Sequence, residues 1–183
     1  MTVMEAIEAR RAYRSLQAVE AGEALARDLS RAASLAASCF NNQPWRLVFA
    51  YEPEALERVK GALSKGNRWA QAASLVIAVC SRRDLDCPNP GRELFAFDTG
   101  MAAAFLILRA TELGLVAHPI AGYDEGKARE ALGIPADMAV IALVIVGRHL
   151  VPASDLLSPA QKEGEAQRPE RKPLAEIMRL NRF

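Results

Sequence analysis

The sequence has no Gly-x-Gly anywhere in its 183 residues, and no Gly-Lys followed by Ser or Thr. These absences exclude the glycine fingerprint of a Rossmann dinucleotide site, the glycine loop of a kinase and the P-loop of an NTPase. A nicotinamide, if the protein uses one, is therefore not held by a Rossmann fingerprint. A Gly-x-Ser-x-Gly elbow is also missing, so acyl-transfer chemistry has no support.

Metal ligands and thiols are scarce as well. The two histidines, His118 and His149, do not form a His-Glu-x-x-His motif, so a zinc site of the usual kind lacks ligands. Cys39, Cys80 and Cys87 are odd in number, contain no Cys-x-x-Cys pair, and include one residue inside an apolar run. We therefore expect free thiols, without a disulfide framework and without a metal site.

Strong charge of either sign and long apolar runs are also lacking. The 23 basic and 22 acidic residues leave a net charge of +1, which gives no field for holding nucleic acid. The longest apolar runs are too short for a membrane span, and residues 1–11 lack the apolar core of a signal peptide. We expect one cytoplasmic domain over residues 1–183 that binds neither nucleic acid nor a membrane.

Apolar periodicity predicts an irregular series of helices and strands. Residues 152–183 are polar and proline-bearing before a short apolar end, so this extension needs another surface to lie on. Because helices and strands do not alternate regularly, we expect an α+β fold and not a doubly wound sheet. The expected helices are 3–10, 23–38, 53–63, 92–113 and 124–132, and the expected extended segments are 46–51, 74–81, 116–122 and 139–147.

Basic side chains gather near both ends of the chain. Arg10, Arg11 and Arg14 follow the first predicted helix, and Arg171 and Lys172 lie in the extension. Several guanidinium groups together match the oxygens of a phosphate monoester. The alternative is that basic residues simply favour the C-terminus of a helix.

Three consecutive amides, Asn41, Asn42 and Gln43, precede Pro44. Each amide offers a donor and an acceptor, as the polar edge of a flavin or a base requires. Asn-Asn before proline is also typical of an ordinary turn, and the residues alone leave both interpretations open.

Seven segments, in this order and at matching intervals, resemble the nitroreductase family of FMN-dependent oxidoreductases. They are ARRAYR, AASCFNNQPWRLVF, GNRWAQAASLVIAV, FDTGMAAAFLILRATELGL, HPIAG, LGIP and AVIALVIVG. The resemblance runs from about Ala6 to about Ile177. It implies a central, mainly antiparallel sheet flanked by helices, in an intertwined homodimer with two FMN sites at the interface and with residues 152–183 packed on the partner subunit.

The resemblance also assigns cofactor contacts. Arg10, Arg11 and Arg171 match residues that grip the FMN phosphate, and Arg14 matches a basic residue beside the flavin N1 atom. The remaining implied contacts are Asn41, Asn42 and Gln43, then Asn67, and finally the loop of Pro119, Ile120, Ala121 and Gly122 beside the flavin N5 atom. Ala12 and Ala121 depart from the family, which often places serine and, in its oxygen-insensitive members, glutamate at these positions.

The activity that the resemblance implies is FMN-dependent reduction of nitroaromatics, quinones or related electron-poor acceptors by NADH or NADPH in a ping-pong scheme. His118 is the one titratable group placed to protonate a product, although a neutral structural histidine is favoured. Alternatives of the same fold are a specialised flavin or enone reductase, a flavin-processing enzyme, a reductase fed by ferredoxin, and a non-catalytic FMN-binding dimer.

Overall fold

Five strands form one sheet in which every paired neighbour is antiparallel. The order is β1-β5-β3-β2, with β4 also pairing with β5. The computed structural model describes residues 1–183, and its strands are β1 Leu16–Gln17, β2 Arg46–Ala50, β3 Leu75–Ser81, β4 Val116–Ile120 and β5 Ala139–His149. The predicted α+β architecture with a mainly antiparallel sheet is confirmed.

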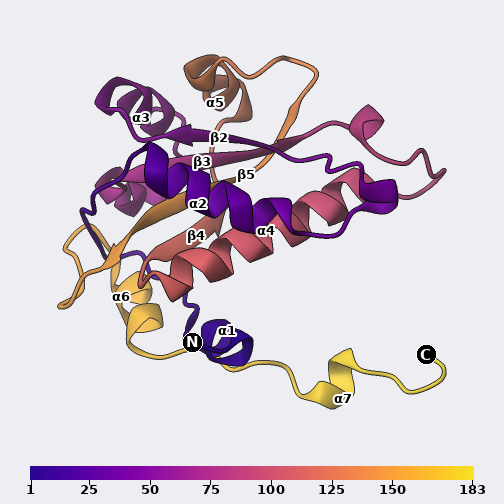
Figure 1. Cartoon of the computed structure of the whole chain (residues 1–183). Helices are drawn as coiled ribbons and strands as arrows, with labels where there is room; N and C mark the ends of the chain where they lie inside the picture. The colour runs from indigo at the N-terminus through magenta and orange to yellow at the C-terminus, as the bar shows by residue number, and fades with distance from the viewer.

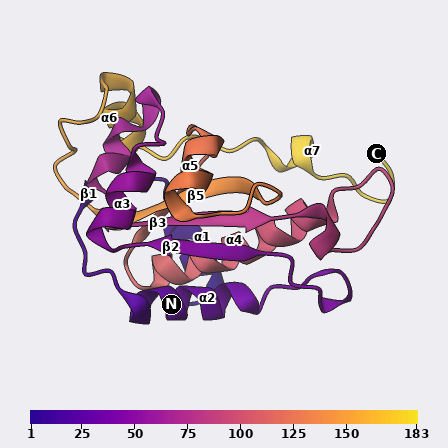
Figure 2. The same ribbon diagram turned by 90° about the horizontal axis from the view of Figure 1, so that it is seen from above.

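Helices cover both faces of this sheet (Figures 1 and 2). On one face lie α3 (Pro53–Lys60) and α5 (Glu125–Leu132), and on the other lie α2 (Glu23–Ser34) and α4 (Leu94–Glu112). An apolar core lies between the sheet and the helices on each face. Alternate residues of β3 point into one core and then the other, so the whole strand is buried. Burial on both faces explains why the predicted extended segment 74–81 is a continuous apolar run.

The first and last helices lie outside these layers. A capping box between Thr2 and Glu5 starts α1 (Val3–Ala9), as the sequence predicts. The extension contains α6 (Pro159–Ala166), which the sequence analysis did not predict, although Ser158 and Gln161 form a capping box there. The short α7 (Leu174–Ile177) and the residues after it are exposed and run away from the sheet (Figure 1).

Helix α4 is the longest helix and keeps an apolar outer face. By length and composition alone it would be able to cross a membrane, but Ala102, Leu106 and Ala110 pack with no exposed surface against α2 and the sheet. Phe97 and Phe105 on the same helix remain 66% and 44% exposed. This outer face, next to α1, is a large apolar surface without a partner inside the chain.

The prediction of free thiols is wrong for two of the three cysteines. Cys39 and Cys87 form a disulfide between Cα atoms 6.1 Å apart, whereas Cys80 is free and buried in β3. Cys39 starts the 3-10 turn η1 (Cys39–Asn41), and Cys87 follows the 3-10 turn η3 (Arg83–Leu85). Sequence spacing did not reveal the pair because the fold brings together two loops that lie 48 residues apart.

Candidate functional site

A cluster of arginines joins the end of α1 to the C-terminal extension. Burial first, and then the charges of Arg168, Arg171 and Arg11, lower the pKa of Arg10. Arg168 also donates to the backbone carbonyl of Arg10 at 2.7 Å and to that of Glu8. These arginines are absent from the ion pairs of the chain. Guanidinium groups crowded together without an ion-pair partner offer a site for an anion.

Helix α6 fixes the segment that carries this cluster. The Glu165 carboxylate accepts hydrogen bonds from the backbone N–H groups of Arg14 and Ser15. Arg11 in turn donates to the backbone carbonyls of Gly164 and Glu165, at 3.4 and 3.2 Å. The extension therefore holds residues 11–15 in place at the same time as it contributes Arg168 and Arg171.

A chain of contacts leads from the arginine segment to the β4 loop. The Tyr13 carbonyl lies 3.0 Å from the His118 Nδ1 atom, and the His118 ring stacks on Trp69 at 4.7 Å between centroids. Trp69 Nε1 donates to the Asn67 side-chain oxygen at 3.1 Å, and Asn67 Nδ2 donates to the Gly122 carbonyl at 2.8 Å. Asn67 lies in the 3-10 segment η2 (Lys65–Ala72).

His118 is part of this framework and does not point freely toward a ligand. It is buried, and desolvation is the main cause that lowers its pKa, helped by the charges of Arg14 and Arg10. The structure therefore favours the structural interpretation of this histidine. Trp69, against which its ring stacks, is 1% exposed and is a core residue.

The loop after β4 approaches Asn67 closely. A Cβ atom on Gly122 would lie 2.5 Å from Asn67 Nδ2 and 2.9 Å from the Ser64 Oγ atom, so a larger residue would displace these side chains. Pro119 and Ala121 are exposed, whereas Ile120 between them is buried. The loop therefore presents Pro119 and Ala121 at the surface, and the preceding His118 connects it to the arginine segment through the Tyr13 carbonyl.

The residues that the structure brings together fit the FMN that the resemblance implies. A phosphate monoester matches the crowded guanidinium groups around Arg10, and the exposed residues Pro119 and Ala121 of the β4 loop leave a surface where a flat polar ring can lie. The assembled residues are Arg10, Arg11, Arg14, Asn67, Pro119, Ile120, Ala121, Gly122 and Arg171, with Arg168 added by the structure.

The three amides are not part of this assembly within one chain. Asn41, Asn42 and Gln43 lie near the N-terminal end of α4, where Asp98 accepts from the backbone N–H of Cys39 at 2.7 Å. The arginine cluster lies beyond the other end of that helix, near α1 and α6 (Figure 1). A single chain therefore carries the two halves of the implied site at separate places.

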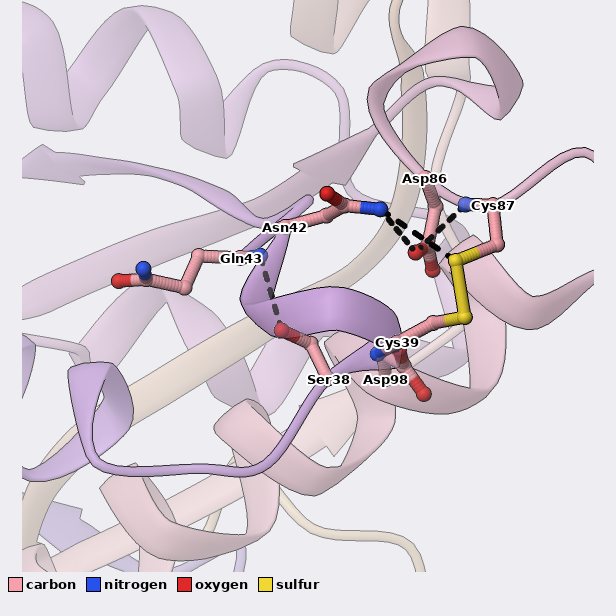
Figure 3. The surroundings of a disulfide bond; sticks show 7 residues. All are labelled: Ser38, Cys39, Asn42, Gln43, Asp86, Cys87 and Asp98. Atoms are coloured by element: carbon pink, nitrogen blue, oxygen red, sulfur yellow. Dashed lines mark hydrogen bonds between the residues drawn. A yellow bond between two sulfur atoms is a disulfide. The ribbon is translucent and has the colours of Figure 1, made fainter.

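The amide segment has an unusual backbone. Phe40, Asn41 and Gln43 all have positive φ angles, of 46°, 59° and 49°. Residues other than glycine are rarely found in this region, and such conformations need support from their surroundings. The Ser38 hydroxyl accepts from the Gln43 N–H at 2.9 Å, and the nearby disulfide and Asp98 hold Cys39 (Figure 3).

Residues 62–148 match the profile of the nitroreductase family. An uncharacterized 15.4 kDa protein of Mycolicibacterium smegmatis is 37% identical over 97 residues, which cover 53% of this chain and 63% of that protein. A Stenotrophomonas maltophilia protein, named provisionally as an NADH dehydrogenase/NAD(P)H nitroreductase, is 33% identical over 110 residues, 50% of this chain and 56% of that protein. The chain thus spans about three fifths of the length of these curated relatives.

A solved structure described as an oxidoreductase containing FMN is similar over nearly the full length. It superimposes with a TM-score of 0.85 at 28% identity, and the match covers 97% of this chain and 91% of that chain. The nitroreductase family protein of Clostridium difficile 630 gives a TM-score of 0.80 at 25% identity and covers 100% of both chains.

Proposed function

We infer, from the premise that this chain belongs to the nitroreductase family, that it is an FMN-dependent oxidoreductase that takes electrons from NADH or NADPH. The observation that carries the proposal is the set of arginines that crowd Arg10, since such a cluster is built for a phosphate. The S. maltophilia relative and the FMN-containing structural neighbour support the same activity and cofactor.

Each residue group has a separate task in this proposal. Arg10, Arg11, Arg168 and Arg171 bind the phosphate of FMN, which, when bound, supplies hydride transfer at its N5 atom. Arg14 places a fixed positive charge beside the flavin ring, where it would stabilise the anionic reduced form of the flavin. The backbone of the β4 loop at Ala121 and Gly122 orients the opposite edge, and Asn67 fixes that loop.

We propose that the site is completed in a homodimer. The amide segment of residues 41–43 lies apart from the arginines of its own chain, and a second copy is the partner that can bring it to them. The apolar outer face of α4 and α1 offers the interface. Within the extension of residues 152–183, α6 packs against its own chain through Glu165, and the exposed residues 172–183 are free to pack on the second copy. A cytoplasmic location, where NADH and NADPH are available, belongs to the same proposal.

The substrates are proposed as classes. Electron-poor acceptors such as nitroaromatics and quinones would use the site in turn with the nicotinamide, in a ping-pong scheme. The chain itself contributes binding, orientation and charge, because the arrangement contains no free acid or base aimed into the site: His118 is engaged with Tyr13 and Trp69.

Anaerobic absorption spectra of the purified protein test this function. We expect an oxidised flavin spectrum, after addition of FMN if necessary, that is bleached by NADH or NADPH and restored by a quinone. A protein that takes up no FMN would refute the cofactor. A flavin that is bleached by dithionite and not by either nicotinamide would refute the donor and favour a ferredoxin-fed reductase or a non-catalytic binding protein.

A further inference from the structure

The surroundings of the disulfide contain a carboxylate whose burial the fold does not explain. Asp86 is 7% exposed and pairs with no cationic side chain in the chain. One oxygen, Oδ1, accepts from the Cys87 N–H at 2.8 Å and from the Asn42 amide at 3.3 Å. The other oxygen, Oδ2, is buried without any hydrogen-bond partner. Buried charges in proteins are usually paired or coordinate a metal.

The disulfide supplies the ligands that would complete such a site. The Sγ atoms of Cys39 and Cys87 and a carboxylate oxygen of Asp86 all lie within 4.8 Å of one another (Figure 3). Two thiolates bound to Zn²⁺ at about 2.3 Å each would lie less than about 4 Å apart, which Cα atoms 6.1 Å apart allow. The loops that carry Cys39 and Cys87 can therefore keep their positions when reduction separates the two sulfur atoms.

We propose that reduction of the Cys39–Cys87 disulfide creates a site for a thiophilic divalent cation, Zn²⁺, with both thiolates and Asp86 as ligands. Two sulfur ligands and one oxygen ligand suit Zn²⁺ better than Mg²⁺ or Ca²⁺, which prefer oxygen alone. Water fills the fourth position. The proposal does not depend on the proposed function.

The two states interconvert by a balanced reaction. A dithiol reductant gives two electrons and two protons: the Sγ–Sγ bond breaks, two S–H bonds form, and the reductant becomes a disulfide. Binding of Zn²⁺ then displaces the two thiol protons into solvent. Because disulfides are uncommon in the cytosol, the metal-binding state is the one expected in that compartment.

A route to the site exists. A cavity of about 630 Å³ is lined by Asp86 and Cys87, with Arg83, Pro88 and Arg92 among its other residues. Both cysteines are partly exposed, so a reductant and a hydrated cation can reach them. Bound Zn²⁺ would also fix the position of Asn42, whose Nδ2 atom lies 3.4 Å from the Cys87 sulfur atom.

Zinc uptake by the full-length chain in its two redox states tests the proposal. The protein, oxidised or reduced anaerobically with a trialkylphosphine, is incubated with Zn²⁺, passed over a desalting column and analysed for metal. We expect an equimolar amount of Zn²⁺ on the reduced protein and none on the oxidised protein. Co²⁺ in place of Zn²⁺ should show a thiolate-to-metal charge-transfer band only after reduction. Equal Zn²⁺ uptake by the oxidised and the reduced wild-type protein would overturn the proposal.

Variants identify the ligands. Cys39→Ser and Cys87→Ser should each abolish uptake by the reduced protein, whereas Cys80→Ala, at the buried free cysteine, should retain it. Asp86→Asn should weaken Zn²⁺ binding at least about tenfold, since loss of a group that only supports a ligand already costs about 10–100-fold. Uptake that survives in Cys87→Ser, or unchanged affinity in Asp86→Asn, would show that the metal binds elsewhere.

Discussion

The carboxylate of Glu165 accepts a hydrogen bond from the backbone N–H of Ser15 at 2.9 Å, across 150 residues of sequence. The same oxygen atom accepts from the N–H of Arg14. The C-terminal extension therefore does more than contribute basic side chains to the candidate phosphate site. It fixes the backbone that carries the N-terminal arginines, so both sides of the arginine cluster depend on the docking of α6.

Replacing Glu165 by Gln should destabilise the protein by about 1–3 kcal/mol at neutral pH, because a neutral amide oxygen accepts the two backbone hydrogen bonds more weakly than the charged carboxylate oxygen does. Urea unfolding measures the loss. Glu163→Gln, on the exposed side of the same helix, is the matched control and should have little effect.

The cost of Glu165→Gln should also depend on pH. Burial by itself would raise the pKa of Glu165, but hydrogen bonds from Ser15 and Arg14 and the nearby His149 outweigh it, so the pKa is lowered. The folded state then binds a proton less readily than the unfolded state, and stability falls as pH falls. The difference between wild type and variant should therefore be greatest above about pH 5 and shrink toward about pH 3. If the difference in unfolding free energy between wild type and variant stays constant over this range, the ionised carboxylate of Glu165 is not the source of the stability.

Replacing Arg171 by Gln should weaken FMN binding about tenfold or more, because a charge-assisted contact with the phosphate is lost. Binding of riboflavin, which has no phosphate, should not change, and this comparison separates a phosphate contact from general damage to the site. Lys172→Gln, at the adjacent exposed position, is the control. Fluorescence titration of each variant with both flavins provides the measurement. An equal loss for FMN and riboflavin would argue against the phosphate role.

The sequence predicts the layered fold well because its signals are local. The apolar run 74–81 predicts β3, the Thr2–Glu5 spacing predicts the start of α1, and Gly133 ends α5 in the left-handed conformation that favours glycine. The start of α6 also has a local sequence signal, because Ser158-Pro159 followed by Gln161 is typical of the first turn of a helix. The polar composition around it has no apolar periodicity that would indicate a helix.

The parts that sequence could not supply are long-range contacts between loops. Neither the Cys39–Cys87 pairing nor the support of Ser15 by Glu165 follows from spacing, because each joins segments that only the folded sheet brings together. Arg168 was missed for a related reason. The resemblance identified Arg171, and only the structure shows that Arg168 also faces Arg10. The separation of the amide segment from the arginines likewise required the fold.

Gly122→Ala should destabilise the protein by about 1–3 kcal/mol and weaken FMN binding, because the new methyl group would collide with Asn67 and Ser64. Gly66→Ala is a close control: it adjoins Asn67, but its Cβ would meet open space. Thermal unfolding and FMN titration of the two variants test the close approach. If Gly122→Ala matches Gly66→Ala in both measurements, the β4 loop does not need the contact with Asn67.

The imidazole of His118 should titrate below its ordinary pKa of 6.5, chiefly because burial disfavours its charged form. NMR titration of the histidine ring signals measures this directly, and His149→Asn identifies the remaining signal as that of His118. The lowered pKa of His118 also predicts an effect on stability. Below pH 6.5 the histidine binds a proton more readily in the unfolded state than in the folded state, so stability declines with acidification. A midpoint at or above 6.5 would contradict this environment.

Phe97→Glu should convert the proposed homodimer to a monomer. Phe97 is 66% exposed on α4, the helix on which Phe105 is 44% exposed, so a charge there opposes burial against a second copy but leaves the monomer core intact. Light scattering after gel filtration measures the mass. Lys127→Glu, on α5 across the sheet, controls for added negative charge and should remain dimeric.

The same variant tests whether the cofactor site needs two chains. If the amide segment of a second copy completes the site, monomeric Phe97→Glu should bind FMN much more weakly, although its arginine cluster is unchanged. Glu165→Gln serves as a comparison, since it perturbs the arginine segment and should leave the dimer mass unchanged. A monomer that binds FMN as tightly as the wild type would show that one chain suffices. In that case the turn made by Asn41, Asn42 and Gln43 has only the local role that its hydrogen bonds to Ser38 and Asp86 describe.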